Sequence, residues 1–183
     1  MRGIRQQLHW HEKPLYRFAP RPDLSDDEDW RRGFALLGRT GWAFELQVFA
    51  GQADPAERLV RDFPHQTFVL EHAGMLEDRS REGWAAWRLL MARLSRYPNV
   101  VTKLSGLGTF LRAARAEDWA PVVRETVDRF GPDRCMFGSN FPIESLWTSY
   151  ADLVAAFRSC IAHLDSGARH AILHGTAERE YGL

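Results

Sequence analysis

Short apolar segments and longer amphipathic segments alternate along this chain. The short segments are typical of strands, and each is followed by a loop and a stretch whose apolar residues recur at helical spacing. The predicted strands cover residues 2–8, 42–49, 67–72, 100–104 and 134–138. Because strand and helix alternate without a break, the pattern predicts right-handed crossovers and a parallel sheet covered by helices.

Local signals mark the ends of the predicted helices. Ser25 is expected to cap the first helix, because Glu28 follows three residues later and completes a capping box. The second predicted helix starts at Asp54-Pro55 and the third starts after Ser80. The fourth surrounds Trp119 and ends at Gly131-Pro132, and the fifth runs from Tyr150 to Leu164. A short helix from Ser166 and a terminal turn near Thr176 complete the pattern. The tryptophans and apolar stripes of these helices are predicted to form the core rather than a cofactor site.

The spacing of the predicted strands indicates the fold class. They begin on average about 33 residues apart, and eight such units would need about 260 residues, close to the size of a (β/α)8 barrel. The chain has 183 residues, enough for five units and a tail. The pattern predicts an α/β fold, and if this fold is a (β/α)8 barrel, about three units are missing, which the strand directly after Met1 places at the N-terminal side. Residues 1–183 are expected to be a single partial barrel domain.

Composition excludes several classes of partner. The chain is 45% hydrophobic and 26% charged, with 24 basic and 24 acidic residues, as in ordinary soluble globular domains. A net charge of zero favours neither nucleic acid nor a membrane surface as a partner. Cys135 and Cys160 lack metal-ligand spacing, and no signal peptide or membrane span is recognisable. These features predict a cytoplasmic protein.

Polar side chains cluster where the predicted strands end, which is where functional groups gather in parallel βα folds. They are Arg5 on the first strand, Glu45 and Gln47 on the second, Glu71 and His72 on the third, Lys103 and Ser105 on the fourth, and Ser139 and Asn140 after the fifth. A histidine at such a place is either a structural residue or a catalytic one. Lys103 needs a partner or a wet cavity, and the alternative to a substrate role is an ion pair with Glu45 or Glu71.

Four motifs carry a resemblance to a known family. FVLEHAG, PNVVTKLSGL, FGPDRCMFGSNFPIESL and TAEREYGL resemble the amidohydrolase-related family of TIM-barrel hydrolases, which includes fuconolactonase-like and pyrone-dicarboxylate-lactonase-like enzymes. The resemblance implies an α/β fold of the (β/α)8 TIM-barrel type, N-terminally truncated to about five βα units, in which the five strands are strands four to eight of the barrel. It also implies a hydrolase that uses activated water on a lactone, ester or amide of a small organic acid or sugar-like compound.

The resemblance gives roles to individual residues. His72 matches the histidine that ends strand six, which polarises a substrate carbonyl or, in metal-dependent relatives, binds the metal. Lys103 and Ser105 match groups that orient substrate or support the site. The aspartate that activates water on strand eight is Asn140 here. We therefore expect another carboxylate to be the base, first Glu144 and then Glu71 or Glu45; the alternative for Glu144 is a solvated acid near the start of the fifth helix.

The segment His9-Trp10-His11 follows the first predicted strand. Alternation would place both imidazoles on one face if the strand continued, as two metal ligands require. Our main prediction is instead that His9 and His11, with Arg5 and Gln47, bind substrate, and that residues 12–22 form a lid. No metal site and no cofactor are predicted, with a divalent metal as the alternative.

Two other functions stay open beside hydrolysis. The chain could be a truncated inactive remnant or a gene-model fragment, in which case exposed barrel edges should cause self-association. It could also bind a ligand without turnover, as the change from aspartate to Asn140 permits.

Overall fold

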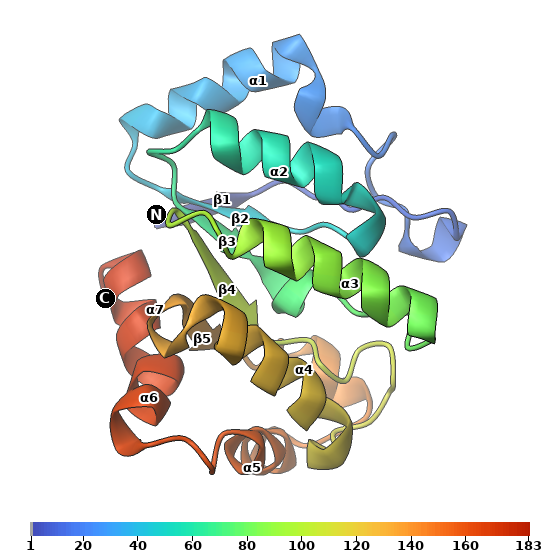
Figure 1. Cartoon of the computed structure of the whole chain (residues 1–183), viewed down its shortest axis with the longest axis vertical. Helices are drawn as coiled ribbons and strands as arrows, with labels where there is room; N and C mark the ends of the chain where they lie inside the picture. Colours follow the sequence, from blue (N-terminus) through green and yellow to red (C-terminus); the bar gives the residue numbers. More distant parts are fainter. Residues whose placement is uncertain (1) are drawn as a thin grey trace.

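The computed structural model describes residues 2–183 and contains a parallel sheet with helices packed around it (Figure 1). The strands follow one another across the sheet in the order β1-β2-β3-β4-β5, and each neighbouring pair is parallel. They are β1 (Gly3–Arg5), β2 (Ala43–Leu46), β3 (Phe68–Leu70), β4 (Val100–Leu104) and β5 (Cys135–Phe137). The predicted architecture of five parallel βα units is therefore confirmed.

Helices connect the strands and continue beyond the last one. They are α1 (Glu28–Phe34), α2 (Ala53–Asp62), α3 (Arg81–Leu94), α4 (Ala116–Phe130), α5 (Tyr150–Cys160), α6 (Ser166–His170) and α7 (Thr176–Tyr181). A π-helical turn, Ala171–Gly175, joins α6 to α7. Short 3₁₀ segments cover Pro14–Tyr16, Leu24–Asp26, Ala35–Arg39, Ala50–Gln52, Glu71–Gly74, Pro132–Arg134 and Ile143–Leu146. No helix of the described part is long and apolar enough to cross a membrane.

The predicted helix ends are partly right. Ser80 caps α3 by accepting a hydrogen bond from the Gly83 amide at 3.0 Å, as predicted. The prediction for Ser25 is wrong, because α1 begins three residues later and its cap is Asp27, whose carboxylate accepts from the Trp30 amide at 2.9 Å. The fifth helix is shorter than predicted, since Ile161 already leaves helical geometry.

The two faces of the sheet are covered by different helices. One face packs side chains such as Phe44, Leu70 and Leu104 into the main core beneath the connecting helices. The other face carries a small apolar cluster, Ala43, Val69, Val101 and Met136, against which Ala177 and Tyr181 of α7 pack. Helix α7, near the C-terminal end in Figure 1, therefore covers part of the face that would line the inside of a barrel.

All strands except β4, which covers the predicted residues 100–104, end earlier than predicted. β2 ends at Leu46 and β3 at Leu70, so Gln47, Glu71 and His72 belong to the turns that follow. These turns place their polar side chains at the edge of the sheet, next to the loops after β4 and β5. The site is built from this set of turns.

Candidate active site

The turn after β3 has a left-handed backbone. His72, Ala73, Gly74 and Met75 have φ angles of 56°, 48°, 73° and 51°. Non-glycine residues in this region cost about 1–3 kcal/mol each, so the surrounding structure has to hold them there. The indole N–H of Trp87 does so by donating to the Ala73 carbonyl at 2.7 Å. The turn thereby holds His72 at the carboxyl edge of the sheet.

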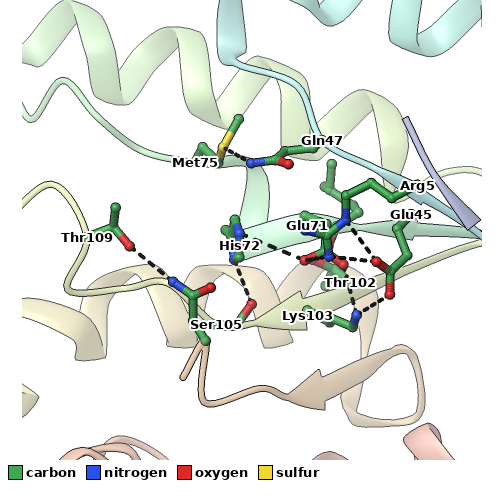
Figure 2. Close-up of polar contacts among 12 residues, drawn as sticks. Arg5, Glu45, Gln47, Glu71, His72, Met75, Thr102, Lys103, Ser105 and Thr109 are labelled. Atoms are coloured by element: carbon green, nitrogen blue, oxygen red, sulfur yellow. Dashed lines mark hydrogen bonds and ion pairs between the residues drawn. The ribbon is translucent and has the colours of Figure 1, made fainter. Parts of the chain in front are cut away.

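His72 is paired with Ser105, as Figure 2 shows, with 2.8 Å between Nδ1 and Oγ. Burial, with the nearby charges of Arg5 and Lys103, lowers the pKa of His72 to about 4. The imidazole is therefore neutral at pH 7, with one nitrogen hydrogen-bonded to Ser105. The sequence correctly brings these two residues to neighbouring turns.

A cluster of four charged side chains lies beside His72 in Figure 2. Lys103 Nζ lies 2.5 Å from Glu45 Oε1 and 2.9 Å from Glu71 Oε1. Arg5 contacts the same two carboxylates at 2.6 and 3.0 Å, and the Tyr181 hydroxyl donates to Glu45 at 2.9 Å. Lys103 therefore forms ion pairs with Glu45 and Glu71, which was the alternative to a substrate role.

The two carboxylates of this cluster respond differently to it. Burial raises the pKa of Glu45, but the hydrogen bond and charge of Lys103, together with Tyr181 and Arg5, outweigh burial and lower it to about 2. Burial is the largest influence on Glu71 and raises its pKa in spite of Lys103 and Arg5. The cations and anions balance, which is how such charges are tolerated away from water.

A cavity of about 390 Å³ opens next to His72. Its polar lining comes from Arg5, Gln7, His9, Gln47, His72, Thr109, Arg112 and Asn140, and its apolar lining from Leu15, Tyr16, Phe18, Phe49, Met75, Phe110 and Ile143, with Gly106. Two buried atoms of the lining, His9 Nδ1 and Gln47 Oε1, have no hydrogen-bond partner within residues 2–183. Buried polar atoms are normally paired, so these two atoms are exceptions within the lining residues.

Asn140 forms part of one wall of this cavity, and Glu144 lies behind it. Asn140 lines the cavity with a left-handed backbone, φ 55°, and its amide nitrogen lies 3.3 Å from Glu144 Oε1. Glu144 is 1% exposed, so the alternative of a solvated acid is wrong. Its carboxylate also accepts hydrogen bonds from Thr109 and Trp147.

The two histidines after β1 go to different places. β1 ends at Arg5, so strand alternation does not apply to them. His9 is buried against Phe18 and lines the cavity. His11 instead lies between Glu77, 3.2 Å from Nε2, and the Lys13 amide, which donates to Nδ1 at 2.9 Å, and it lines a neighbouring cavity.

The side chains present do not make a metal centre. Among residues 2–183 no group of three or more His, Cys, Asp or Glu side chains could hold a metal ion. The lid segment contributes Leu15, Tyr16 and Phe18 to the cavity, whereas Arg17 donates to the carbonyls of His11 and Glu12.

Several site residues were missed at the sequence level. Thr109 and Phe110 lie in the loop after β4, beyond the strand end where polar residues were sought. Tyr181 lies in the TAEREYGL motif, but the motif says nothing of a contact with Glu45. No local pattern indicated these positions, because they depend on how loops and α7 fold back onto the sheet.

Comparisons with known proteins agree with this architecture. The family profile described as Amidohydrolase matches residues 1–183. An uncharacterized protein of Sinorhizobium fredii, y4mH, is 36% identical over 98% of this chain and 60% of its own length. The L-fucono-1,5-lactonase of Burkholderia multivorans is 34% identical over 100% of this chain and 63% of its own.

A solved structure matches as well. It is an amidohydrolase from Burkholderia multivorans with bound zinc, which superimposes with a TM-score of 0.86 at 31% identity and covers 100% of this chain and 65% of that one. The chain therefore spans less than two thirds of the length of these relatives.

Proposed function

The chain belongs to the amidohydrolase family, and we propose that its cavity is the active site of a hydrolase that opens a lactone with an activated water molecule. The single observation that carries this proposal is the arrangement at the cavity wall. A neutral imidazole, an arginine and an asparagine, His72, Arg5 and Asn140, line one space of about 390 Å³. This volume suits a ligand of a few rings at most.

His72 is proposed to polarise the substrate carbonyl. If its Nδ1 accepts the proton of Ser105, Nε2 carries a hydrogen and can donate to the carbonyl oxygen. A neutral donor beside a guanidinium stabilises an oxyanion without giving up a proton at pH 7. Ser105 then acts by selecting this tautomer.

Arg5 is proposed to supply the positive charge of the site. It is the member of the charged cluster that lines the cavity. Glu45 and Glu71 hold its guanidinium on two sides, and Lys103 neutralises the second charge that they bring. Lys103 would therefore orient Arg5 through the carboxylates.

The proposed substrate is the 1,5-lactone of a sugar acid. Two relatives named L-fucono-1,5-lactonase support this class, at 34% and 29% identity. We propose that polar side chains of the lining, such as Gln47 and Arg112, contact its hydroxyl groups, and that the aromatic rings Tyr16, Phe49 and Phe110 contact its C–H faces. The zinc of the Burkholderia amidohydrolase enters no step, because the donors described above do not form a metal site.

The test is hydrolysis by the purified 183-residue chain. L-Fucono-1,5-lactone, a plain aliphatic δ-lactone and an aryl ester would be followed against spontaneous hydrolysis in the same buffer. We expect turnover of the sugar lactone and a loss of about 100-fold or more in His72→Gln, as for a residue acting directly on the reacting group. A wild-type rate equal to the spontaneous one contradicts the proposal.

One observation favours ligand binding without turnover as the second candidate. Asn140 cannot act as a base, although it lines the cavity at the place where the family resemblance expects an aspartate. Calorimetry with the hydroxy acid product distinguishes the two functions: saturable binding by a chain that leaves the lactone intact supports the second.

Two further proposals concern the extent of the domain and its association with a second copy of the chain. We propose that residues 1–183 are one partial barrel domain and that β1 associates with a second copy. On the described chain β1 pairs with β2 alone, and Ile4 is 40% exposed. Light scattering over a range of concentrations tests this, and a monomer throughout contradicts it.

A further inference from the structure

Glu144 is a buried carboxylate whose oxygens both accept hydrogen bonds. Oε1 accepts from the Thr109 hydroxyl at 2.9 Å and from the Asn140 amide at 3.3 Å, and Oε2 accepts from the Trp147 indole at 2.5 Å. Three donors face its two oxygens, so every hydrogen bond of this side chain is one that it accepts. The site therefore holds a proton acceptor, one layer behind the cavity wall.

Thr109 connects this acceptor to the cavity. Among residues 2–183 the cavity lining includes Thr109 and Asn140 but not Glu144. The backbone at Gly108, next to Thr109, packs closely against Glu144, because a Cβ on Gly108 would lie 2.8 Å from Glu144 Oε2. A threonine hydroxyl donates one hydrogen and still accepts another, so it can stand between a water molecule and Glu144.

Asn140 cannot make the same connection. Its NH₂ group faces Glu144 and Thr109 Oγ1, 3.3 and 3.4 Å away, because Glu144 offers only acceptors. The amide oxygen is then left as an acceptor that can orient water. An aspartate at this position would place a second carboxylate beside Glu144, which like charges disfavour.

We propose that Thr109 is a catalytic residue that relays a proton from the attacking water to Glu144. This inference rests on the proposed hydrolysis. The water oxygen bonds to the acyl carbon as the C=O π electrons move onto the carbonyl oxygen, while the water proton passes to Thr109 Oγ1 and the proton of Thr109 passes to Glu144 Oε1. When the bond between the acyl carbon and the ring oxygen breaks, the proton returns along the same path to the ring oxygen. The product is the open hydroxy acid, which releases its carboxylic proton to solvent.

Two variants of Thr109 test the relay. Thr109→Val keeps the shape and removes the hydroxyl, whereas Thr109→Ser keeps the hydroxyl. With L-fucono-1,5-lactone we expect kcat to fall about 100-fold or more in Thr109→Val, with KM little changed, and to stay within about threefold in Thr109→Ser. Glu144→Gln should lose as much, and the Thr109→Val/Glu144→Gln double variant no more than either, since residues that act as a unit are not additive.

An NMR measurement distinguishes a proton relay through Thr109 from a purely structural role of Thr109. The Trp147 indole proton, assigned with Trp147→Phe, reports whether Glu144 keeps its place, and it should stay at low field in Thr109→Val. If Thr109→Val keeps the wild-type turnover, the relay is contradicted but the proposed hydrolysis is not. If both Thr109 variants lose the rate and also lose the Trp147 signal, Thr109 has a structural role, and the relay is contradicted while the proposed hydrolysis is not. A wild-type chain without turnover overturns the hydrolase and the relay together.

Discussion

His72 and Ser105 follow neighbouring strands of the sheet, and their Nδ1 and Oγ atoms lie 2.8 Å apart. The serine occupies one nitrogen of the imidazole, and the other nitrogen, Nε2, lies 3.9 Å from Glu71 Oε2. The protonation state of His72 is a property of this site that can be measured directly.

The first prediction concerns pH. Burial, Arg5 and Lys103 lower the pKa of His72 to about 4, whereas an unfolded histidine titrates near 6.5. As the pH falls from about 6.5 to 4, the unfolded chain takes up a proton that the folded chain does not. The contribution of His72 to stability is therefore full above pH 6.5 and is lost toward pH 4, by an amount on the order of 3 kcal/mol.

Two measurements check this prediction. NMR titration of the imidazole should show no protonation of His72 between pH 8 and 5. Urea unfolding should give a free energy that rises from pH 4 to 6.5, and His72→Gln should flatten that rise. A midpoint near pH 6.5 in the folded chain contradicts the prediction.

The second prediction concerns Gly106, which packs against His72. Its φ is +59°, and a Cβ there would lie 2.8 Å from His72 Nδ1. Gly106→Ala should destabilise the chain by about 2 kcal/mol, from a strained backbone and a displaced imidazole. The control is Gly33→Ala in α1, where nothing lies within 4 Å and about 0.5–1 kcal/mol of stabilisation is expected. Thermal unfolding of both variants would show opposite shifts.

The third prediction concerns the left-handed turn. Trp87→Phe leaves the Ala73 carbonyl without the donor that holds it, and a buried unpaired group costs about 1–3 kcal/mol. We expect a loss in that range in denaturant unfolding and broadened NMR signals from residues 72–75. Trp84→Phe changes the partly exposed neighbouring ring and should cost less than about 1 kcal/mol. Equal losses would mean that the bond to Ala73 does not support the turn.

The fourth prediction concerns charge balance. Lys103→Met leaves Glu45 and Glu71 with Arg5 as the remaining cation of the cluster, and Glu71 has a side chain only 2% exposed. Removing one partner of such a cluster should cost about 3 kcal/mol. Adding Glu71→Gln restores the balance, so the double variant should be less destabilised than the sum of the two single variants. A double-mutant cycle from urea unfolding measures the difference, and strict additivity contradicts it.

The residues that the sequence placed correctly share one property. His72, Ser105 and Asn140 lie at or just after strand ends, and strand period and alternation locate such positions without knowledge of the loops. The parallel order of the sheet followed from the same alternation of strand and helix.

The errors have local physical causes. Ser25 and Asp27 are both good caps, and the choice between them depended on which side chain reached a free amide. The burial of Glu144 depended on the indole of Trp147 and the hydroxyl of Thr109, two donors that only the folded loops bring together. The left-handed turn at His72 has a single glycine, so composition alone did not indicate it.

The hydrogen bond from Tyr181 to Glu45 joins residues 136 positions apart. During synthesis Arg5, Glu45, Glu71 and Lys103 all leave the ribosome long before Tyr181 does. The apolar cluster of Ala43, Val69, Val101 and Met136 must likewise wait for α7 to cover it. A nascent chain that has formed β5 but not yet α7 would therefore still expose this face, and chaperones that recognise apolar surface would have most access to it in that interval.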